Sequence, residues 1–464
     1  MRLLWLVALA IALLVAPTAQ AAPWKRVTTP DLGVTDQPGL VRTPDGVLHL
    51  AWQRSDPAVP NSMHLNHTAI TAGGRLGATS TIAAAWNFFQ NPALVVDPAG
   101  LRVFAPAIRS TTPGEKLDEI STFLSTDGGT VWTPGPDNIV PDGGQAAAYP
   151  VAAAVLPSGE MLQTWAGTLG TWVHSGLSRT SPIHDYQKGY GQYGYNPNIA
   201  ADAAGAAMLA WYSSGAAKRG VLARGVAPGG APAGDAETMP GTGGMTSGMS
   251  GLTPLAARVG GGFFVAYPVG RSVWLWRVGN DSAQRIARTR QGSRAVTVAA
   301  TSDGRLWVAW VRQTLGGPRL FATRSNRSGT FFGTVVSAGR PRGSAQGNNL
   351  SSSATSDGRL DVLANFQIGA TSEAAVYYRR LLPGLTLVAR PRRLRRDVSQ
   401  DVRFTVLDAG DPVSGARVRV GGISGRTGQN GTVTLELAGR SATARATKAG
   451  YVKATRRVRA VGPR

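Results

Sequence analysis

The segment His184–Tyr195 concentrates side chains that are suited to binding. It contains Tyr186, Tyr190, Tyr193 and Tyr195 among glycines and glutamines. A core strand has no need for so many phenols separated by glycine, whereas exposed tyrosine among small polar residues is typical of adaptable contact loops. The ring can stack on a ligand while the hydroxyl forms hydrogen bonds. The segment is therefore predicted to be a binding loop, the alternative being a loop that packs onto a neighbouring unit.

Other chemistries have less support in the sequence. The chain has no cysteine and five histidines, which argues against disulfides, thiol chemistry and a catalytic zinc site. His64 and His67 are three residues apart, and on a strand this spacing places them on opposite faces. The sequence lacks a phosphate-binding loop, a nucleophile elbow and the HExxH motif. We therefore predict neither a metal nor another cofactor.

The elements that position the tyrosines are predicted to be short strands in a repeated unit. Seven stretches each combine an apolar strand, a turn that contains glycine, and a second strand that ends in a small residue and an aromatic residue or proline. These stretches are Leu40–Trp52, Pro92–Pro106, Pro150–Trp165, Asn198–Trp211, Thr253–Tyr267, Ala295–Trp310 and Ser352–Phe366. Their turn glycines recur every 42 to 59 residues. A period of about fifty residues with four short strands per unit fits a β-propeller blade.

One hairpin carries a more specific motif. Ser125-Thr-Asp-Gly-Gly-Thr-Val-Trp132 reads S-x-D-x-G-x-x-W. Asp127 can accept bonds from backbone N–H groups in its own turn, and Gly128 and Gly129 can take the positive φ that a tight hairpin requires. The motif resembles the Asp-box (BNR repeat) of sialidase-like β-propellers. Since those propellers usually have six blades, the predicted fold class is an all-β, seven-bladed or alternatively six-bladed, β-propeller followed by a small β-sandwich.

The resemblance implies that ligands bind at the face where the first strand of each blade begins, opposite the glycine turns. Amides and phenols there would hydrogen-bond and stack on a sugar, or else they would cap the starts of strands. With the tyrosine loop and two arginines, the predicted ligand-binding residues are Gln37, Gln90, Asn91, Arg109, Tyr149, Tyr190, Tyr193, Tyr195, Asn196, Arg312, Asn348 and Asn349.

The resemblance also implies where catalytic groups would lie. Sialidases carry an arginine before the first inner strand that binds the substrate carboxylate, and the matching residues here are Gln90-Asn91-Pro92. The closest match to the acid/base aspartate is Asp118, with Glu115 and Glu119 beside it. Without the arginine, and without an assignable nucleophile pair, an active sialidase is not expected.

The two ends of the chain differ from the repeats. Residues 1–21 have a basic start, an apolar core and a small-x-small site that ends at Ala21, which predicts a signal peptide and secretion to the exterior or the cell envelope. No later stretch is apolar enough for a transmembrane segment. The propeller is placed at 24–384, a linker at 385–396, and a domain that resembles carboxypeptidase-regulatory-like or bacterial Ig-like β-sandwiches at 397–464. Residues 229–251 are predicted to be a flexible loop.

The formal net charge is +22, of which +12 falls within residues 385–464. Such a secreted basic chain is expected to meet an anionic cell-envelope polymer or a glycan, with an extracellular protein as a further option, rather than nucleic acid. Composition bias alone is the alternative. The leading hypothesis is a non-catalytic propeller that binds a glycan or envelope ligand on its channel face, with the basic sandwich as a tether. The alternatives are a glycoside hydrolase that uses Asp118 or Glu115 as general acid, and a purely structural scaffold.

Overall fold

The computed structural model describes residues 23–462 except 32–36, 57, 60–61, 110–116, 136–149, 168–169, 179, 192, 246–250, 290–291 and 370–372. The predicted signal peptide lies outside the described residues. Those residues are organised into β-sheets, and the only helical element among them is a short 3₁₀ turn, η2 (Pro228–Gly230). None of their helices is long and apolar enough to span a membrane.

The described residues between 25 and 381 form seven antiparallel sheets in which the strands pair mainly in chain order. Each of the seven predicted repeats supplies the first two strands of its own sheet. The first four sheets contain β2 (Gly39–Arg42), β3 (Leu48–Ser55), β4 (Met63–Ile70), β5 (Leu76–Trp86); β6 (Phe88–Phe89), β7 (Ala93–Asp97), β8 (Gly100–Arg109), β9 (Leu117–Ser125), β10 (Thr133–Pro134); β11 (Val151–Val155), β12 (Met161–Ala166), β13 (Thr171–Ser175), β14 (Ile183–Asp185); and β15 (Gly194–Ala201), β16 (Ala207–Ser214), β17 (Arg219–Val226), β18 (Pro232–Thr238).

The remaining three sheets complete the series. They contain β19 (Leu255–Ala257), β20 (Phe263–Val269), β21 (Ser272–Arg277), β22 (Gln284–Arg288); β23 (Ser293–Ala300), β24 (Leu306–Thr314), β25 (Gly317–Arg324), β26 (Val336–Gly339); and β27 (Ser344–Ala354), β28 (Leu360–Ile368), β29 (Ala374–Leu381), β1 (Lys25–Arg26). The last sheet thus takes its outer strand from the start of the described chain, where Lys25 pairs with Tyr378. β18 falls within the predicted loop at 229–251, so that prediction is wrong for this stretch.

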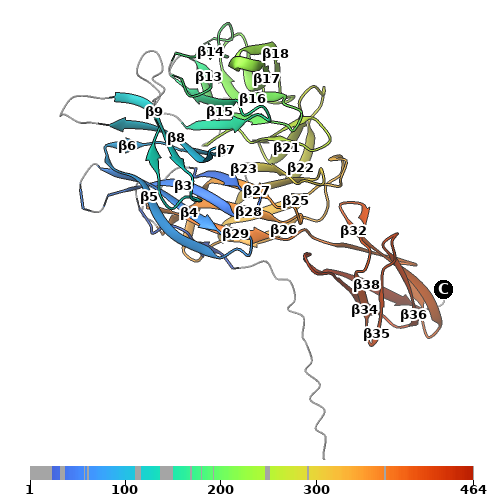
Figure 1. Ribbon diagram of the computed structural model, residues 1–464. Helices are drawn as coiled ribbons and strands as arrows, with labels where there is room; N and C mark the ends of the chain where they lie inside the picture. The colour runs from blue at the N-terminus through green and yellow to red at the C-terminus, as the bar shows by residue number, and fades with distance from the viewer. Residues whose placement is uncertain are drawn as a thin grey trace, which may run out of the picture.

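The sheets are arranged in a closed ring. The first strand of each sheet contacts the first strand of the next, and β27 contacts β2 to complete the circle. Each neighbouring pair of sheets shares a hydrophobic core, including the pair that closes the ring, where Leu50 and Trp52 pack with Leu363 and Val376. This arrangement around a central channel is that of a β-propeller (Figure 1).

Local sequence explains the turns between the first and second strands. The first, sixth and seventh sheets share a Thr-x-Asp-Gly turn, at Thr43, Thr301 and Thr355, in which the threonine hydroxyl donates to the aspartate two residues later. The glycine of each turn has a φ between +81° and +85°, a conformation that residues with a Cβ seldom adopt.

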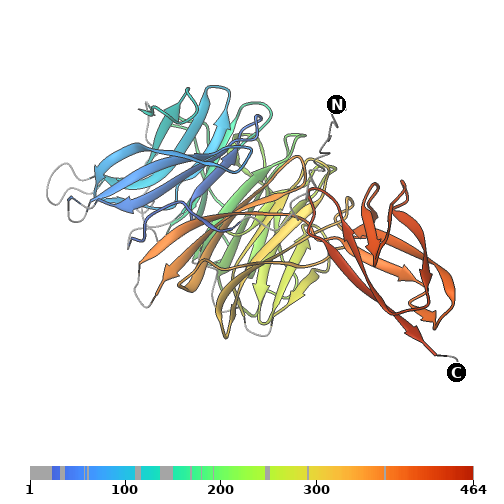
Figure 2. The same ribbon diagram turned by 90° about the horizontal axis from the view of Figure 1, so that it is seen from below.

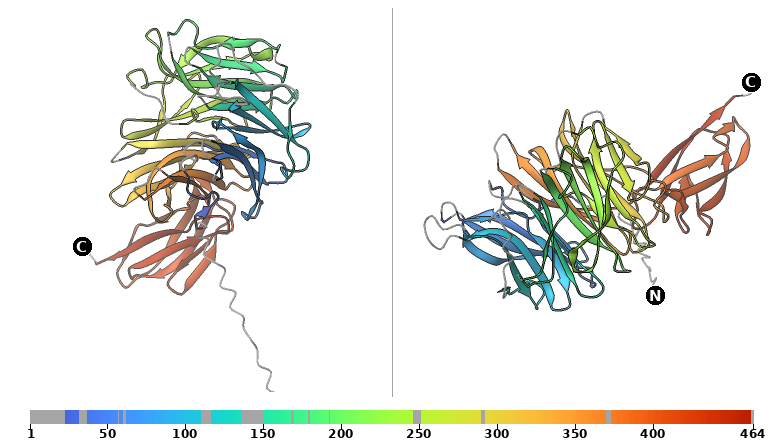
Figure 3. Two further views of the ribbon diagram at one scale, coloured as in Figure 1. Left: turned by 90° about the vertical axis from the view of Figure 1, so that its left-hand side faces the viewer. Right: turned by 90° about the horizontal axis from the view of Figure 1, so that it is seen from above.

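The C-terminal residues form two further sheets beside the ring (Figures 2 and 3). The first contains β30 (Thr386–Arg390), β32 (Ser399–Asp408), β33 (Asp411–Pro412) and β36 (Thr432–Ala438), and the second contains β31 (Arg393–Arg395), β38 (Ala454–Val461), β37 (Ala442–Thr447), β34 (Arg417–Val420) and β35 (Ile423–Arg426). They share one core, which includes Phe404, Val418 and Val458. Residues 385–396, the predicted linker, instead form β30 and β31 and bury Leu387, Ala389 and Leu394 in that core.

Buried ion pairs attach the C-terminal sheets to the ring. Arg305 Nη2 of the sixth sheet lies 2.6 Å from Asp411 Oδ2. Arg324 of the same sheet pairs with Asp408, whose side chain is 2% exposed. Gly384 connects the parts through backbone bridges to Thr334 and Val452. Because these groups are charged, mutually paired and, apart from the partly exposed Asp411, buried, they fix the position of the C-terminal sheets.

Candidate functional site

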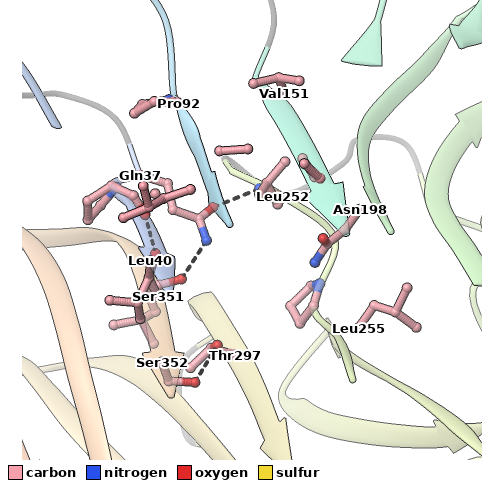
Figure 4. Close-up of a pocket in the computed structure, with 18 of the residues that line it drawn as sticks. Gln37, Leu40, Pro92, Val151, Asn198, Leu252, Leu255, Thr297, Ser351 and Ser352 are labelled. Atoms are coloured by element: carbon pink, nitrogen blue, oxygen red, sulfur yellow. Dashed lines mark hydrogen bonds between the residues drawn. The ribbon is translucent and has the colours of Figure 1, made fainter. Parts of the chain in front are cut away.

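The central channel is narrow and closely packed. Its cavity has a volume of about 170 Å³ and is lined by residues from the first strands of all seven sheets in the described structure (Figure 4). Most lining side chains are apolar. The polar ones satisfy one another or the backbone: Thr297 Oγ1 lies 2.8 Å from Ser352 Oγ, and Asn198 Nδ2 donates to the Thr253 carbonyl at 2.9 Å. A ligand larger than this cavity could therefore use the channel only at its mouth.

Gln37 spans this mouth. Its Nε2 donates to the Leu350 carbonyl at 2.9 Å, and its Oε1 accepts from the Leu252 amide at 2.8 Å. One side chain therefore links the segments before two sheets to the first strand of a third, as Figure 4 shows. The amide satisfies backbone groups, which is the strand-capping alternative considered from the sequence.

Of the other predicted amide residues, four form contacts within the protein and one, Asn91, has a side-chain oxygen without a partner in the described structure. The side-chain oxygens of Asn349 and Gln37 both lie close to Gly251, and Asn348 Oδ1 accepts from Gln346 Nε2 at 2.7 Å. Gln90 and Asn196 form backbone bonds at the starts of their sheets. Asn91 differs from these, because its side chain is 4% exposed and its Oδ1 has no hydrogen-bond partner in the described structure. A buried oxygen without a partner costs free energy, and a ligand donor would remove that cost.

Three tyrosines form a stack at the start of the fourth sheet. The rings of Tyr193 and Tyr195 are stacked with centroids 6.2 Å apart and an interplanar angle of 16°, and Tyr195 stacks on Tyr212 at 6.2 Å and 29°. Tyr212 is buried and donates its hydroxyl hydrogen to the Met245 carbonyl at 3.0 Å. Tyr193 is 41% exposed and has a φ of +70°. The stack thus presents one phenol face to solvent from a fixed base.

A buried glutamine holds the predicted binding loop in place. Gln187 accepts from Trp211 Nε1 at 2.7 Å and donates to Ser213 Oγ at 2.8 Å and to the Gly191 carbonyl at 3.0 Å. Within the same loop Tyr186 is fully buried and donates to the Gly230 carbonyl. Tyr190 is half-buried: its hydroxyl accepts from the Ala236 amide, and the ammonium of Lys218 lies 5.4 Å from its ring centroid. The loop therefore packs onto the fourth sheet, and Tyr193 is the exposed one of its four tyrosines.

The predicted catalytic carboxylates are only partly placed. Glu115 lies outside the described residues, as does the predicted ligand residue Tyr149. In the pairing of β8 with β9, Ile108 is opposite Asp118, and the adjacent Arg109 is opposite Leu117. These backbones place all four positions at the channel-face end of the second sheet. Glu119 is 6% exposed and accepts from Ser121 Oγ at 2.7 Å.

Asp185, which was not predicted from the sequence, is the last residue of β14 and lies at the channel-face end of the third sheet. Burial raises the pKa of this carboxyl above its usual value. It lies across from Trp172 in the strand pairing and accepts from the Gln187 amide at 2.8 Å. A partly buried carboxyl beside an aromatic ring is a suitable environment for a general acid. The sequence feature that could have identified Asp185 is its position after His184, within the tyrosine loop.

Arg312, the remaining predicted ligand residue, lies at the end of β24. Its guanidinium carbon is 4.5 Å from the ring centroid of Phe321. This cation–π contact fixes the side chain over the sixth sheet, distant along the ring from the fourth sheet and its tyrosines. The structure therefore does not bring Arg312 together with Tyr193.

Two of the five histidines, His49 and His67, form a buried pair. His49 Nδ1 lies 3.0 Å from His67 Nε2, and both rings are buried. Burial and the neighbouring His49 lower the pKa of His67 to about 4, so that the pair is neutral near neutral pH. His64 points to the other face of β4 and bonds Asp56 at 2.8 Å. Among the described residues no group of three or more side chains is arranged to hold a metal ion.

The hairpin at 125–132 has the expected internal bonds. Asp127 Oδ1 accepts from the amides of Thr130 and Val131, each at 3.0 Å. Trp132 Nε1 donates back to the Gly129 carbonyl at 3.1 Å. This turn lies opposite the channel face and packs on His67, so its role is structural.

Comparison with known proteins gives similarity in structure alone. No family model and no curated protein matches the sequence. A protein of unknown function from Dyadobacter fermentans covers 78% of this chain and 99% of its own at 12% identity and a TM-score of 0.49. An α-L-arabinanase from Penicillium chrysogenum covers 78% and 98% at 13% identity and a TM-score of 0.41. A polysaccharide lyase covers 75% and 90% at 11% identity and a TM-score of 0.47. No functional role follows from similarities of this size.

Proposed function

We propose that the protein is a secreted, non-catalytic, glycan-binding β-propeller with seven blades, one for each sheet of residues 24–381. The residues from 386 onward form a small β-sandwich that resembles carboxypeptidase-regulatory-like or Ig-like domains and acts as a basic tether to the envelope. The observation that carries the glycan proposal is the tyrosine stack, whose exposed member Tyr193 offers a rigid aromatic face where the first strand of the fourth sheet begins.

The chemistry of the mouth suits a sugar. The apolar face of a pyranose or furanose ring packs on an aromatic ring, and its hydroxyls donate to unpaired acceptors. Tyr193 supplies the ring. Asn91, whose buried oxygen has no partner in the described structure, lies two sheets away along the ring and would be a separate acceptor. The narrow channel beneath the mouth excludes a polymer, so we infer that the ligand is the end or a short stretch of a glycan chain.

A glycan array with the chain from Ala22 onward tests this proposal. Replacing Tyr193 with Ala should weaken the binding of any glycan that is retained by about tenfold, because stacking contributes about 0.5–1.5 kcal/mol beyond buried area. Tyr193→Phe should retain most of the affinity. Phe331→Ala, at an aromatic residue that is 55% exposed, serves as the control. Binding that is unaffected by Tyr193→Ala would refute the proposed site.

The raised pKa of Asp185 favours one other function, a glycoside hydrolase in which a loop carboxyl is the general acid. Asp118 is the second candidate for that role. The panel of glycans that the array retains should be assayed for hydrolysis with the unmodified chain, with Asp185→Asn and with Asp118→Asn. Turnover that either substitution abolishes would replace the non-catalytic proposal with the enzymatic one.

A further inference from the structure

Charge is divided unequally between the two C-terminal sheets. The strands of the second sheet contain nine arginines and no acidic residue. The arginines are Arg393, Arg395, Arg417, Arg419, Arg426, Arg445, Arg456, Arg457 and Arg459. Of the five acidic residues within 385–464, four lie on the first sheet: Asp401, Asp408, Asp411 and Glu436. We call the outward side of the second sheet the arginine face.

Cations on the arginine face oppose one another directly. In the antiparallel register Arg417 faces Arg426 and Arg419 faces Arg445. Arg417 and Arg419 are exposed, and they alternate with the buried Val418 and Val420, so their side chains point away from the core. Like charges that face each other across strands destabilise a sheet. A polyanion on this face would remove the repulsion.

The arginine face continues into a groove against the ring. The groove has a volume of about 1280 Å³, and its other wall comes from β26 and the end of β29. Its lining includes six cations and no acidic residue: Arg379, Arg417, Arg426, Arg445, Lys448 and Lys453. Arg445 Nε is buried and has no hydrogen-bond partner, and none of the five C-terminal cations forms an ion pair with a described residue.

The walls of the groove are fixed relative to one another. The pairs of Arg305 with Asp411 and of Arg324 with Asp408 lie at the junction, and Tyr451 of the groove lining is 3.5 Å from Asp408 Oδ2. These pairs neutralise acidic groups of the first sheet and leave the cations of the second sheet without carboxylates. The groove is thus a preformed cationic site rather than a gap between loosely connected parts.

The geometry points to an anionic polysaccharide as the ligand of the arginine face and its groove. Guanidinium groups bind carboxylate, sulfate and phosphate through paired N–H bonds. Of the twelve cations named on the second sheet and in the groove, all but Arg379 of the ring lie within residues 393–459. Single-stranded nucleic acid is usually held by aromatic rings that stack on bases. The five strands of this sheet contain no Phe, Tyr or Trp, and the groove lining contains one aromatic residue, Tyr451, whose hydroxyl lies beside Asp408. The inference deepens the tether part of the proposed function and does not depend on the channel-face site.

The test measures binding of the chain from Ala22 onward to polygalacturonate, dextran sulfate, neutral dextran and single-stranded DNA, at about 50 and about 200 mM salt. The variant Arg417→Gln/Arg426→Gln/Arg445→Gln should weaken binding of the two anionic polysaccharides by about tenfold to a hundredfold. Its melting temperature should be unchanged or higher, because cross-strand repulsion is relieved. The matched control removes three exposed arginines of the ring, Arg277→Gln/Arg285→Gln/Arg288→Gln, and should retain binding.

Retention of polygalacturonate but not dextran sulfate would identify carboxylate as the recognised group, and the reverse would identify sulfate; either supports the inference. Equal losses in the two triple variants would overturn it, since net charge rather than this face would then cause binding. Tighter binding of DNA than of either polysaccharide would also overturn it. Tyr193→Ala should leave polyanion binding unchanged, so failure of the channel-face proposal and failure of this one are separable.

Discussion

The guanidinium of Arg42, on the first strand of the ring, lies 2.7 Å from the carboxylate of Asp361, on the second strand of the last sheet. Asp361 is fully buried and also accepts from Arg380 Nε and from the Tyr378 hydroxyl, each at 2.7 Å. One carboxylate therefore holds two arginines and a phenol at the seam where the ring closes.

Replacing Asp361 with Asn should destabilise the protein by about 3–5 kcal/mol, because the buried Arg380 and the partly buried Arg42 would lose their counter-charge. Urea unfolding followed by tryptophan fluorescence measures the change. Asp357→Asn is the control: Asp357 is 50% exposed and pairs with Arg359, so its loss should cost less than about 1 kcal/mol. Equal effects in the two variants would contradict a special role for the seam.

Stability should decrease as the pH falls from about 6.5 to about 4. The folded-state pKa of His67 is lowered to about 4, so the unfolded chain binds a proton at His67 at higher pH than the folded chain does. Burial lowers the pKa of His49 as well. The expected loss from His67 alone is about 3 kcal/mol. Denaturant midpoints at a series of pH values test this, and a curve that is flat across that interval would exclude it.

The hairpin at 125–132 provides a matched pair of glycine substitutions. Gly129 has a φ of +92°, and an added Cβ would lie 2.1 Å from His67 Cε1. Gly128 has a φ of +75° and no atom within 4 Å of the same position. Gly129→Ala should therefore destabilise by about 3 kcal/mol or more, and Gly128→Ala by about 1 kcal/mol. Thermal unfolding of both variants measures the difference. The two variants would lose equal stability if the positive φ, and not the contact with His67, caused the destabilisation.

Asp408→Asn should loosen the C-terminal sheets. Its side chain is 2% exposed and pairs with Arg324, which would remain buried without a charged partner, while Arg305 would keep its pairs with Asp411 and Asp303. We expect an additional unfolding transition and faster proteolysis near residue 384, at a cost of about 3–5 kcal/mol. Asp401→Asn, on an exposed part of the same strand, is the control. A single transition identical to that of the unmodified chain would argue against docking by this pair.

On the arginine face, Arg417→Gln/Arg426→Gln should stabilise the protein in the absence of ligand. The two guanidinium groups oppose each other across β34 and β35, and removing a like-charge pair gains about 0.2–1 kcal/mol. Differential scanning calorimetry at low salt measures the gain, which should shrink as salt is added. Arg285→Gln/Arg288→Gln, on an exposed strand of the ring, should give no comparable increase.

Much of the strand pattern was predictable because its signals are local. The glycine turn and apolar alternation of Leu40–Trp52 and its six counterparts depend on neighbouring residues alone. β18 was missed because Pro232–Thr238 is an outer strand that buries only Ala236 fully, so it has no alternating pattern. At 385–396 the arginines obscured the alternation of Leu387 and Ala389, which face the core.

The candidate site was less predictable because its contacts are distant in sequence. Nothing near Gln37 indicates that its amide bonds to Leu350 and Leu252. The tyrosine loop was identified from composition, but which phenol is exposed depends on the bonds of Tyr186 to Gly230 and of Gln187 to Trp211. Asp185 was missed because burial, which raises its pKa, comes from the assembled sheet.

The pairing of β1 with β29 has a consequence for how the chain folds during its synthesis. Lys25 and Tyr378 are partners although nearly the whole ring separates them along the chain. A polypeptide that emerges from its N-terminus therefore carries its closing strand from the beginning and must keep it unpaired until the seventh sheet has appeared. Until that moment the growing array has two open edges, which invite pairing with other chains. Closure of the ring is thus a single late event. Removing either β1 or β29 would leave an open, aggregation-prone row of sheets.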